Sequence, residues 1–586
     1  MEVRNIDTDV LIIGGGTAGC WAALTLAGEV GPRRGQVQRP PRVLVVEKAG
    51  LERSGCLAAG VNALNAYITP GHTPQDYVEY ARRDAEGIIR DDLALSACER
   101  LNEVTHELDR LGLVILRGPD GEYAARGWRN IKINGENIKP LLAKAVRSAP
   151  NVEVLEHVNV TDLLTAGEAP TGAEAAAAPV PRVAGAVGFS VREPVAYVLR
   201  ARAVLVATGG AAGIYKPNNP GFSRHKMWYP PFNTGAGYAM GLRAGAEMTT
   251  LEMRFVALRC KDTIAPTGTI AQGVGAKQVN ARGEVYETKY GLTTSERVYG
   301  TVHENLLGHG PCYLRTSGID EGAADSLLKA YLNMAPSQTL KWIESGKSPA
   351  EQDVEIDGTE PYVVGGHTAS GYWVDTDRRA TLPGLYAAGD VAGGFPQKYV
   401  TGALAEGAIA ADAIAADLNG TEVPRSFVPF ARIVEGYERH LTAADARTPA
   451  PFTAEELEEG MQKAMDVYAG GISTGYGFND ATLAIARERI DQLGQLAAGL
   501  PAATPRELLD VYELTDRLTV ARALIAHLEA RRETRWHVFD ENLQHPERDD
   551  EHFGQVYIES VMGANGSVRT FERPLVKEAR YEHPHR

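Results

Sequence analysis

The segment from residue 9 to residue 47 constrains the fold more than any other part of the sequence. Residues 9–13 and 43–46 are apolar runs of the kind that form fully buried parallel strands. A glycine-rich stretch at residues 14–19 ends the first run and opens a helix expected over residues 17–30. Strand, glycines, helix and second strand in this order predict a βαβ unit that binds a dinucleotide.

Each glycine of the GxGxxG pattern has its own physical task. Gly14 permits a tight turn, Gly16 lets the backbone approach a pyrophosphate, and Gly19 lets the helix pack closely on the strand. The N-terminus of the helix then stabilises the phosphate charge. Glu47 ends the second strand, where a carboxylate can accept hydrogen bonds from a ribose diol, and the adjacent Lys48 is expected at the same cofactor.

Composition narrows the classes of function. The 586-residue chain has a formal net charge of -15, which argues against a nucleic-acid binder because such proteins need a basic face. A small anionic substrate remains compatible, since local charge can oppose the net charge. No apolar run reaches the ~18 residues of a membrane span, and the start lacks a signal-peptide pattern, so we expect a cytoplasmic protein. The five cysteines form no CxxC pair, so we expect no metal site and no iron–sulfur cluster in this chain.

The order of the elements predicts an α/β fold in which the cofactor domain is split. Buried-strand patterns recur at residues 203–207 and 385–388, on either side of a stretch with mixed periodicity. We therefore expect a Rossmann-like cofactor domain with an inserted α+β capping domain, followed by a C-terminal helical domain. Thr453 and Thr504, each with a Glu three residues later, predict helix starts in the last part. The expected parts are residues 1–230 and 356–426 for the cofactor domain, 231–355 for the capping or substrate domain, and 427–586 for the helical domain and tail.

Two later segments indicate which dinucleotide is bound. Ala207-Thr208-Gly209-Gly210 follows one buried strand, and Gly389-Asp390 follows another. With the opening pattern, these segments resemble the FAD-binding domain of the fumarate reductase and succinate dehydrogenase flavoprotein superfamily. The resemblance implies FAD, with Asp390 on its ribityl or pyrophosphate side. Members with covalent flavin have a His in the stretch matching Ser54-Gly55-Cys56, and this chain has none there, so the implied FAD is non-covalent, with Ser54 and Gly55 among its contacts.

Other blocks are similar to the alpha subunit of dissimilatory adenylylsulfate reductase. Fumarate reductases and succinate dehydrogenases carry an HGxNRLGG-like segment soon after the third FAD motif, which here is Gly389-Asp390. The catalytic Arg of that segment is missing from residues 394–407 of this chain. The similarity to the adenylylsulfate reductase family is spread from residue 9 to around residue 575. Its most specific stretches are Trp228-Tyr229 and Arg259 with Lys261-Asp262.

This resemblance implies five residues near the chemistry. Asn65 and Glu136 match positions near the isoalloxazine, and Trp228 matches a tryptophan packed by the flavin and the substrate. Arg259 and His367 match a cationic pair that holds a sulfonyl group. Their chemistry suits that role, because Arg presents a fixed fork of donors to oxyanions and His can donate a proton near neutral pH.

The resemblance also implies a reaction and a partner. It makes the chain an FAD-dependent oxidoreductase of sulfur metabolism that converts adenylylsulfate to sulfite and AMP through a flavin N5–sulfite adduct. Electrons would come from a separate subunit, for which the family uses a ferredoxin-like protein with two [4Fe–4S] clusters. The family usually has His at the positions of Gln397 and Leu404, and these departures bear on the nucleotide substrate rather than on the flavin.

Two other functions remain open from the sequence. A fumarate-reductase-like enzyme that reduces another electrophile, such as an enoate, would need a proton donor beside the flavin, and Arg259 is available for that role. A non-catalytic flavoprotein or electron-relay subunit would have kept the FAD site and lost the substrate pocket. Trp228, Arg259 and His367 gathered in one pocket would disfavour the second alternative.

Overall fold

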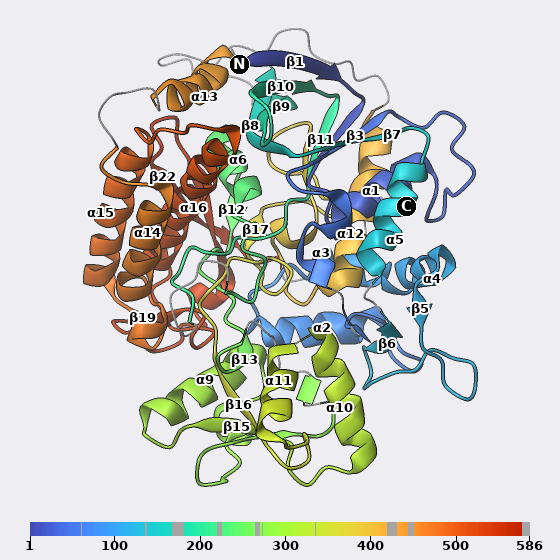
Figure 1. The fold of residues 1–586 in the computed structure, drawn as a ribbon, viewed down its shortest axis with the longest axis vertical. Helices are drawn as coiled ribbons and strands as arrows, with labels where there is room; N and C mark the ends of the chain where they lie inside the picture. The colour runs from blue at the N-terminus through green and yellow to red at the C-terminus, as the bar shows by residue number, and fades with distance from the viewer. Residues whose placement is uncertain are drawn as a thin grey trace.

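The structure is a computed structural model, and its chain forms three parts that Figure 1 separates clearly. The cofactor-binding part (blue, cyan and yellow-orange) lies at the upper right, the capping module (green) at the bottom, and the C-terminal helices (orange and red) at the left. The structure describes residues 1–59, 61, 63–134, 137–166, 181–218, 226–263, 270–271, 273–334, 336–418, 430–443 and 450–576.

A five-stranded parallel sheet with strand order β18-β11-β2-β3-β7 forms the centre of the cofactor-binding part. β2 and β11 are buried along their whole length, as expected for strands covered on both faces. The sheet draws strands from before and after the capping module, which confirms the split α/β architecture predicted from the sequence. The five strands are β2 (Val10–Ile13), β3 (Val43–Glu47), β7 (Val152–Glu156), β11 (Ala203–Val206) and β18 (Leu385–Ala387).

Helices α1 (Thr17–Ala27) and α12 (Tyr399–Asp417) lie side by side in this part (Figure 1). A Cβ at Gly407 would lie 2.4 Å from the carbonyl oxygen of Ala18, so glycine is what permits this close approach. Among the described helices, α12 is the one with the length and hydropathy of a membrane span, but 72% of that window is buried inside the protein. Its apolar side chains are therefore used in the core.

The remaining elements of the cofactor-binding part surround this centre. A four-stranded sheet has the order β1-β10-β9-β8, with β1 parallel to β10 and the other pairs antiparallel. A small antiparallel sheet has the order β4-β6-β5. The elements are β1 (Glu2–Asp7), β4 (Ala63–Leu64), β5 (Val114–Ile115), β6 (Ile131–Asn134), β8 (Val158–Ala166), β9 (Arg182–Ser190), β10 (Val195–Arg200), α2 (Pro74–Asp84), α3 (Asp91–Cys98), α4 (Leu101–Leu111) and α5 (Ile138–Ser148).

The capping module is built on an antiparallel sheet with the order β13-β16-β15-β14. Its first strand starts at Leu258 and its last ends at Gly358. The sequence places the start of this part at residue 231, and the structure differs. α6 (Ala236–Ala244) packs on helices and strands of the other two parts, and its apolar residues are buried against them. The module contains β13 (Leu258–Cys260), β14 (Lys277–Val279), β15 (Cys312–Arg315), β16 (Val354–Gly358), α8 (Glu287–Tyr290), α9 (Thr294–Leu306), α10 (Glu321–Met334) and α11 (Pro336–Ser345).

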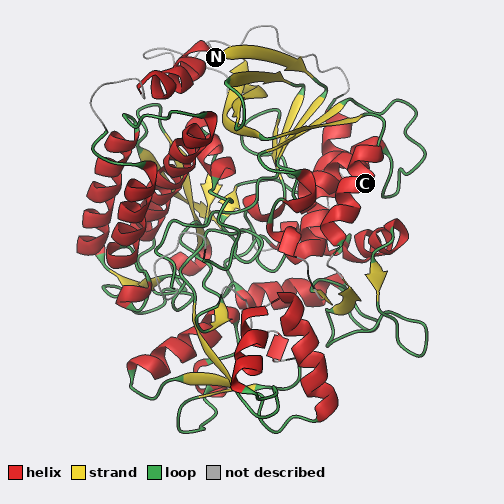
Figure 2. Cartoon of the chain, in the orientation of Figure 1, coloured by secondary structure: helices red, strands yellow, loops and turns green. Residues whose placement is uncertain are grey.

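The C-terminal part is helical only as far as Ala530. Two of its helices begin where the capping patterns predict, α14 (Ala454–Tyr468) after Thr453 and α16 (Pro505–Ala530) after Thr504. The chain then returns as two strands that extend a sheet begun earlier in the sequence, in the order β17-β12-β21-β22 (Figure 2). The other elements are α13 (Ala431–Ala443), α15 (Asp480–Ala497), β12 (Met248–Thr249), β17 (Gly371–Tyr372), β19 (Gly477–Phe478), β20 (Glu541–Asn542), β21 (Val556–Met562) and β22 (Val568–Pro574).

Candidate active site

A cavity of about 580 Å³ lies at the carboxyl edge of the parallel sheet. Four neighbouring strands reach it at their carboxyl ends, through Ile13, Val46, Ala207 and Ala388. Ligands of open α/β sheets bind at this edge. Residues of α9 also line the cavity, so it is shared between the cofactor-binding part and the capping module.

The opening glycine pattern forms one wall of the cavity. Gly14 has φ +101°, and a Cβ there would lie 2.5 Å from the carbonyl oxygen of Ala207. A Cβ at Gly19 would lie 2.0 Å from the carbonyl oxygen of Gly14, so Gly19 serves helix packing and does not itself line the cavity. Gly16 precedes α1 and provides no side-chain cap, which leaves the first N–H groups of the helix available to an anion.

Glu47 and Lys48 both line the cavity, and both are held by protein groups. Glu47 accepts hydrogen bonds from the N–H of Gly15 at 2.8 Å and the N–H of Ala49 at 2.9 Å, so its carboxylate orders the glycine loop. The Lys48 ammonium donates to Glu513 at 2.6 Å. Beneath the same loop, the buried ammonium of Lys139 donates to the carbonyl oxygen of Gly15.

One tyrosine joins the second FAD motif, residues 207–210, to the third, residues 389–390. Tyr229 donates to a carboxylate oxygen of Asp390 at 2.7 Å and accepts from the N–H of Gly210 at 3.0 Å. Ala207, Thr208, Gly209, Gly389 and Asp390 line the cavity, and Gly210 lies behind them.

Buried charged side chains hold the backbone turn of the third motif at Gly389. Glu406 accepts from the N–H of Gly389 at 2.8 Å and pairs with Lys398 at 3.2 Å and Arg378 at 3.1 Å. Lys398 in turn donates to the carbonyl oxygen of Ala392 at 2.6 Å. These side chains of Lys398, Arg378 and Glu406 are fully buried, so the turn at Gly389 is fixed by a closed set of ionic contacts.

The residues present fit a dinucleotide cofactor. The hydroxyl oxygens of Thr208 and Ser54 are buried and have no hydrogen-bond partner within the described part of the chain, which is the state expected of groups that contact a ligand. Gly55, at φ +75°, lines the cavity near them. Uncapped helix N–H groups, unpaired hydroxyls and a lining acid, Asp390, together match the phosphates and polyol of FAD.

Aromatic rings form the opposite end of the cavity. The Trp228 ring lies 4.9 Å from Phe255 and 5.1 Å from His367, centroid to centroid, and His367 lies 5.3 Å from Tyr399. Burial lowers the pKa of His367, with Asp390 opposing the effect, so the ring is neutral near pH 7. Its Nδ1 is buried without a partner among the described residues.

The remaining expected residues are placed as follows. Asn65 lines the cavity. Glu136 lies outside the described residues. Arg259 does not contribute to the cavity lining: its guanidinium donates to the backbone carbonyl of Thr263 at 2.8 Å and to that of Asn218. The preceding residue on β13, Leu258, faces the cavity, so strand alternation turns Arg259 away from it.

Among the described residues, the arginine that does line the cavity is Arg297, on the first turns of α9. Its guanidinium makes no hydrogen bond or ion pair within the described residues, and its Nε is buried. Sequence reasoning missed this residue because the capping segment lacks a clear period. A signal was present, since Thr293 and Glu296 form a capping box that marks a helix start three residues before Arg297.

Comparisons with known proteins agree with this geometry. Residues 9–403 match the FAD binding domain family, and residues 458–585 match the fumarate reductase flavoprotein C-terminal family. The solved adenylylsulfate reductase of Archaeoglobus fulgidus superimposes with a TM-score of 0.90 and 32% identity over 99% of this chain and 98% of that one. The chain belongs to the adenylylsulfate reductase alpha-subunit family of FAD-binding flavoproteins.

Two further members of the family support this assignment. The adenylylsulfate reductase subunit alpha of Megalodesulfovibrio gigas is 28% identical, over 90% of this chain and 89% of that protein. A solved adenosine-5-phosphosulfate reductase in complex with sulfite, as a covalent adduct, has a TM-score of 0.88 and 31% identity, over 99% of this chain and 98% of that one. The chain is therefore an FAD-dependent oxidoreductase, as the sequence predicted.

Tyr229→Phe tests how the FAD motifs are joined. The substitution leaves the Asp390 carboxylate without its donor and the buried N–H of Gly210 without its acceptor, which costs about 1–3 kcal/mol. We expect FAD to bind roughly ten-fold or more weakly, measured by fluorescence titration of the apoprotein. Tyr468→Phe, at a half-buried tyrosine on α14, is the control and should leave FAD affinity unchanged. Equal FAD affinity in Tyr229→Phe and the unmodified protein would contradict the assignment.

Proposed function

We propose that this chain is the catalytic subunit that reduces adenylylsulfate to sulfite and AMP. The observation that carries the proposal is that the FAD-binding wall and an anion-binding end share one cavity. Arg297, His367 and Trp228 all line this cavity; the Arg297 guanidinium makes no hydrogen bond or ion pair within the described residues, and the His367 ring is neutral. The whole-chain similarity to adenylylsulfate reductases, one of them bound to sulfite, supports the same substrate.

The charges of the reaction explain why such groups are needed. Two electrons reduce the sulfur, and the bond between sulfur and the phosphate oxygen breaks with its electron pair on oxygen. Both products, sulfite and AMP, are anions, so negative charge accumulates at the site. A cation in a cavity shielded from water stabilises that charge far more than it would at the surface. Arg297 is placed for this role.

The protein divides the remaining tasks among its own side chains. FAD, when bound, supplies the two-electron chemistry. Trp228 and Phe255 exclude water from the end of the cavity, and Asn65 offers an amide to orient the cofactor or substrate. His367 can take up a proton as an anion arrives, because a nearby negative charge raises the pKa of an imidazole. Arg259 is proposed to hold the backbone segments at Asn218 and Thr263 together.

Electrons are proposed to come from a ferredoxin-like iron–sulfur subunit in the cytoplasm. The relative from Megalodesulfovibrio gigas is named as a subunit alpha, which supports a second subunit. Within the described residues, no three His, Cys, Asp or Glu side chains come together as a metal site. The enoate alternative gains no support, because the fumarate reductases that superimpose on the chain are 18% identical and show only a common fold.

FAD is proposed to be bound without a covalent link. Gly55 has no side chain to bond the flavin, and desolvation at the cavity wall, with Asp390 nearby, raises the pKa of the Cys56 thiol to about 12, so the thiol stays protonated near neutral pH. Acid precipitation should therefore release all of the yellow colour into the supernatant. Flavin fluorescence that stays with the denatured polypeptide on a gel would contradict this prediction.

Anaerobic turnover with reduced methyl viologen tests the substrate. We expect AMP and sulfite to form from adenylylsulfate, with little oxidation of viologen by fumarate. Arg297→Met should lower kcat/KM by a few hundred-fold, equivalent to about 3–4 kcal/mol of lost charge stabilisation, while FAD stays bound. Arg259→Met should act mainly through reduced thermal stability. Faster turnover with fumarate than with adenylylsulfate would overturn the proposal.

The pH dependence of sulfite binding tests His367. Its pKa is lowered in the free site, and a bound anion favours the protonated ring, so sulfite binding takes up a proton. Affinity should therefore tighten as pH falls below about 6.5, by up to ten-fold per pH unit. Loss of flavin absorbance on sulfite titration provides the measurement. His367→Gln isolates the effect from the protonation of sulfite itself, and an identical pH slope in this variant would remove His367 from the anion site.

A further inference from the structure

The segment between the third FAD motif and α12 has an unusual backbone. Gln397 and Tyr399, on either side of Lys398, have φ values of +69° and +50°, in the left-handed region that side chains other than Gly rarely adopt. Both residues line the cavity. Backbone strain of this kind persists only where surrounding contacts hold it, and it concentrates at functional sites.

The contacts that hold Gln397 converge on one carboxylate. The Gln397 side chain is buried, and its amide nitrogen donates to Asp84 at the end of α2, with a longer contact of 3.4 Å to the hydroxyl of Thr294. The other oxygen of Asp84 accepts the backbone N–H of Thr294 at 2.8 Å. The hydroxyl of Tyr77 also donates to the Gln397 carbonyl, at 2.8 Å. One carboxylate thus joins α2, the turn before α12 and the capping module.

The bond to Thr294 is a helix cap supplied from outside the helix. Thr294 is the first residue of α9, and its N–H is one of the orphan donors at that end. Thr293 and Glu296 satisfy other groups through their capping box, so Asp84 completes the cap from another part of the fold. A carboxylate here also interacts favourably with the helix dipole. Because Arg297 lies one turn further along, the position of Asp84 fixes where its guanidinium sits.

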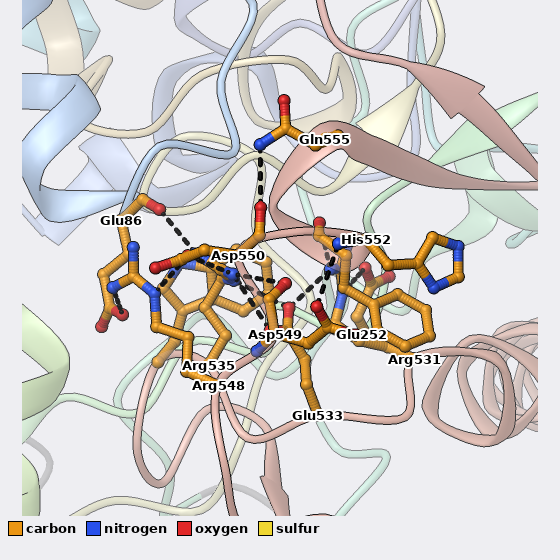
Figure 3. Close-up of polar contacts among 12 residues, drawn as sticks. Glu86, Glu252, Arg531, Glu533, Arg535, Arg548, Asp549, Asp550, His552 and Gln555 are labelled. Atoms are coloured by element: carbon orange, nitrogen blue, oxygen red, sulfur yellow. Dashed lines mark hydrogen bonds and ion pairs between the residues drawn. The ribbon is translucent and has the colours of Figure 1, made fainter.

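The turn after Asp84 is held from its other side by the C-terminal segment, as Figure 3 shows. Arg548 donates to the Glu86 carboxylate at 2.9 Å, and Arg535 donates to the Glu86 carbonyl at 3.0 Å. Arg535 is itself held by two bonds to Glu533, at 2.7 and 3.0 Å. These ion pairs are partly or fully buried, so Asp84 projects from a rigid turn.

We propose that Asp84 and Gln397 form a clasp that fixes the capping module against the cofactor-binding part and thereby positions Arg297 at the cavity. Gln397 is then a positioning residue that acts through α9. Only the identity of the anion met by Arg297 rests on the proposed function, since the clasp itself is a property of the protein fold.

Gln397→Glu makes the clasp depend on pH. The introduced carboxyl faces Asp84 and can donate to it only while one of the two is protonated. The other ionisable groups that face Asp84 are Arg129, Tyr80 and Tyr399. Arg129 stays charged, and burial raises the pKa of both phenols, so none of the three changes form between pH 5.5 and pH 8.

Hydrogen exchange in the first turn of α9 measures the clasp directly. In FAD-loaded Gln397→Glu we expect wild-type protection at pH 5.5 and about ten-fold or greater loss of protection at pH 8, each relative to the unmodified protein at that pH. The sulfite dissociation constant should rise in parallel. Gln397→Met should loosen the same turn at both pH values. Gln492→Glu, which places a carboxyl beside Glu488 on exposed α15, is the matched control and should change neither quantity.

The double variant Asp84→Asn with Gln397→Glu provides the rescue. The double variant exchanges the positions of the amide and the carboxylate. The amide at position 84 still accepts from the Thr294 N–H, and it donates to the carboxylate at position 397. Protection and sulfite affinity should return at pH 8, which a purely structural role for either residue would not produce. Wild-type protection in Gln397→Glu at pH 8, or no recovery in the double variant, would overturn the clasp. Failure of the unmodified protein to bind sulfite would instead overturn the proposed function and leave the exchange result standing.

Discussion

A close backbone approach between β2 and α1 sets the position of the cofactor-binding elements around it. α1 starts directly from the end of β2 because Gly14 and Gly19 bring backbone atoms together where any Cβ would collide. That contact places the uncapped N–H groups of α1 at the carboxyl edge of the sheet. The neighbouring strands end at the same edge, so their terminal residues Ala207 and Ala388 become walls of one cavity. Without this approach, the helix N-terminus and the other two motifs would not meet.

Buried ions then fix the loops that the sheet alone cannot fix. A turn such as that at Gly389 has few backbone partners of its own, and its N–H is held by Glu406. Removing one member of such a buried set leaves an unpaired charge, which is far more costly than never having the set. In the same way, the carboxylate of Glu47 at the end of β3 holds the N–H of Gly15 in the glycine-rich loop. Charges in the interior of this protein therefore serve mainly to hold backbone groups in place, whereas the Arg297 guanidinium at the cavity has no hydrogen-bond or ion-pair partner among the described residues.

Sequence reasoning succeeded where the signal is local. The glycine pattern, the acid after β3 and the capping boxes at Thr453 and Thr504 each depend on neighbouring residues, and each forms the predicted element. The start of the capping module could not be found this way, because α6 is apolar on a face whose partners lie hundreds of residues away. The same limit explains why the sequence pointed to Arg259, whereas the structure places Arg297 in the lining of the cavity. The chain contains many arginines, and only the pairing of β13 and the placement of α9 decide which one reaches the cavity.

The two anionic ligands proposed for the cavity are handled by different kinds of group, and this difference has a physical reason. A cofactor that stays bound can be met by backbone N–H groups and helix dipoles, which are rigid and cannot adjust. A substrate whose charge changes during the reaction and whose products must leave is better met by a side chain on a separate module. Arg297 belongs to the capping module, so its distance from the flavin depends on how that module is held. The hydrogen bonds of Asp84 then influence catalysis although Asp84 is absent from the lining of the cavity, because they decide where Arg297 lies.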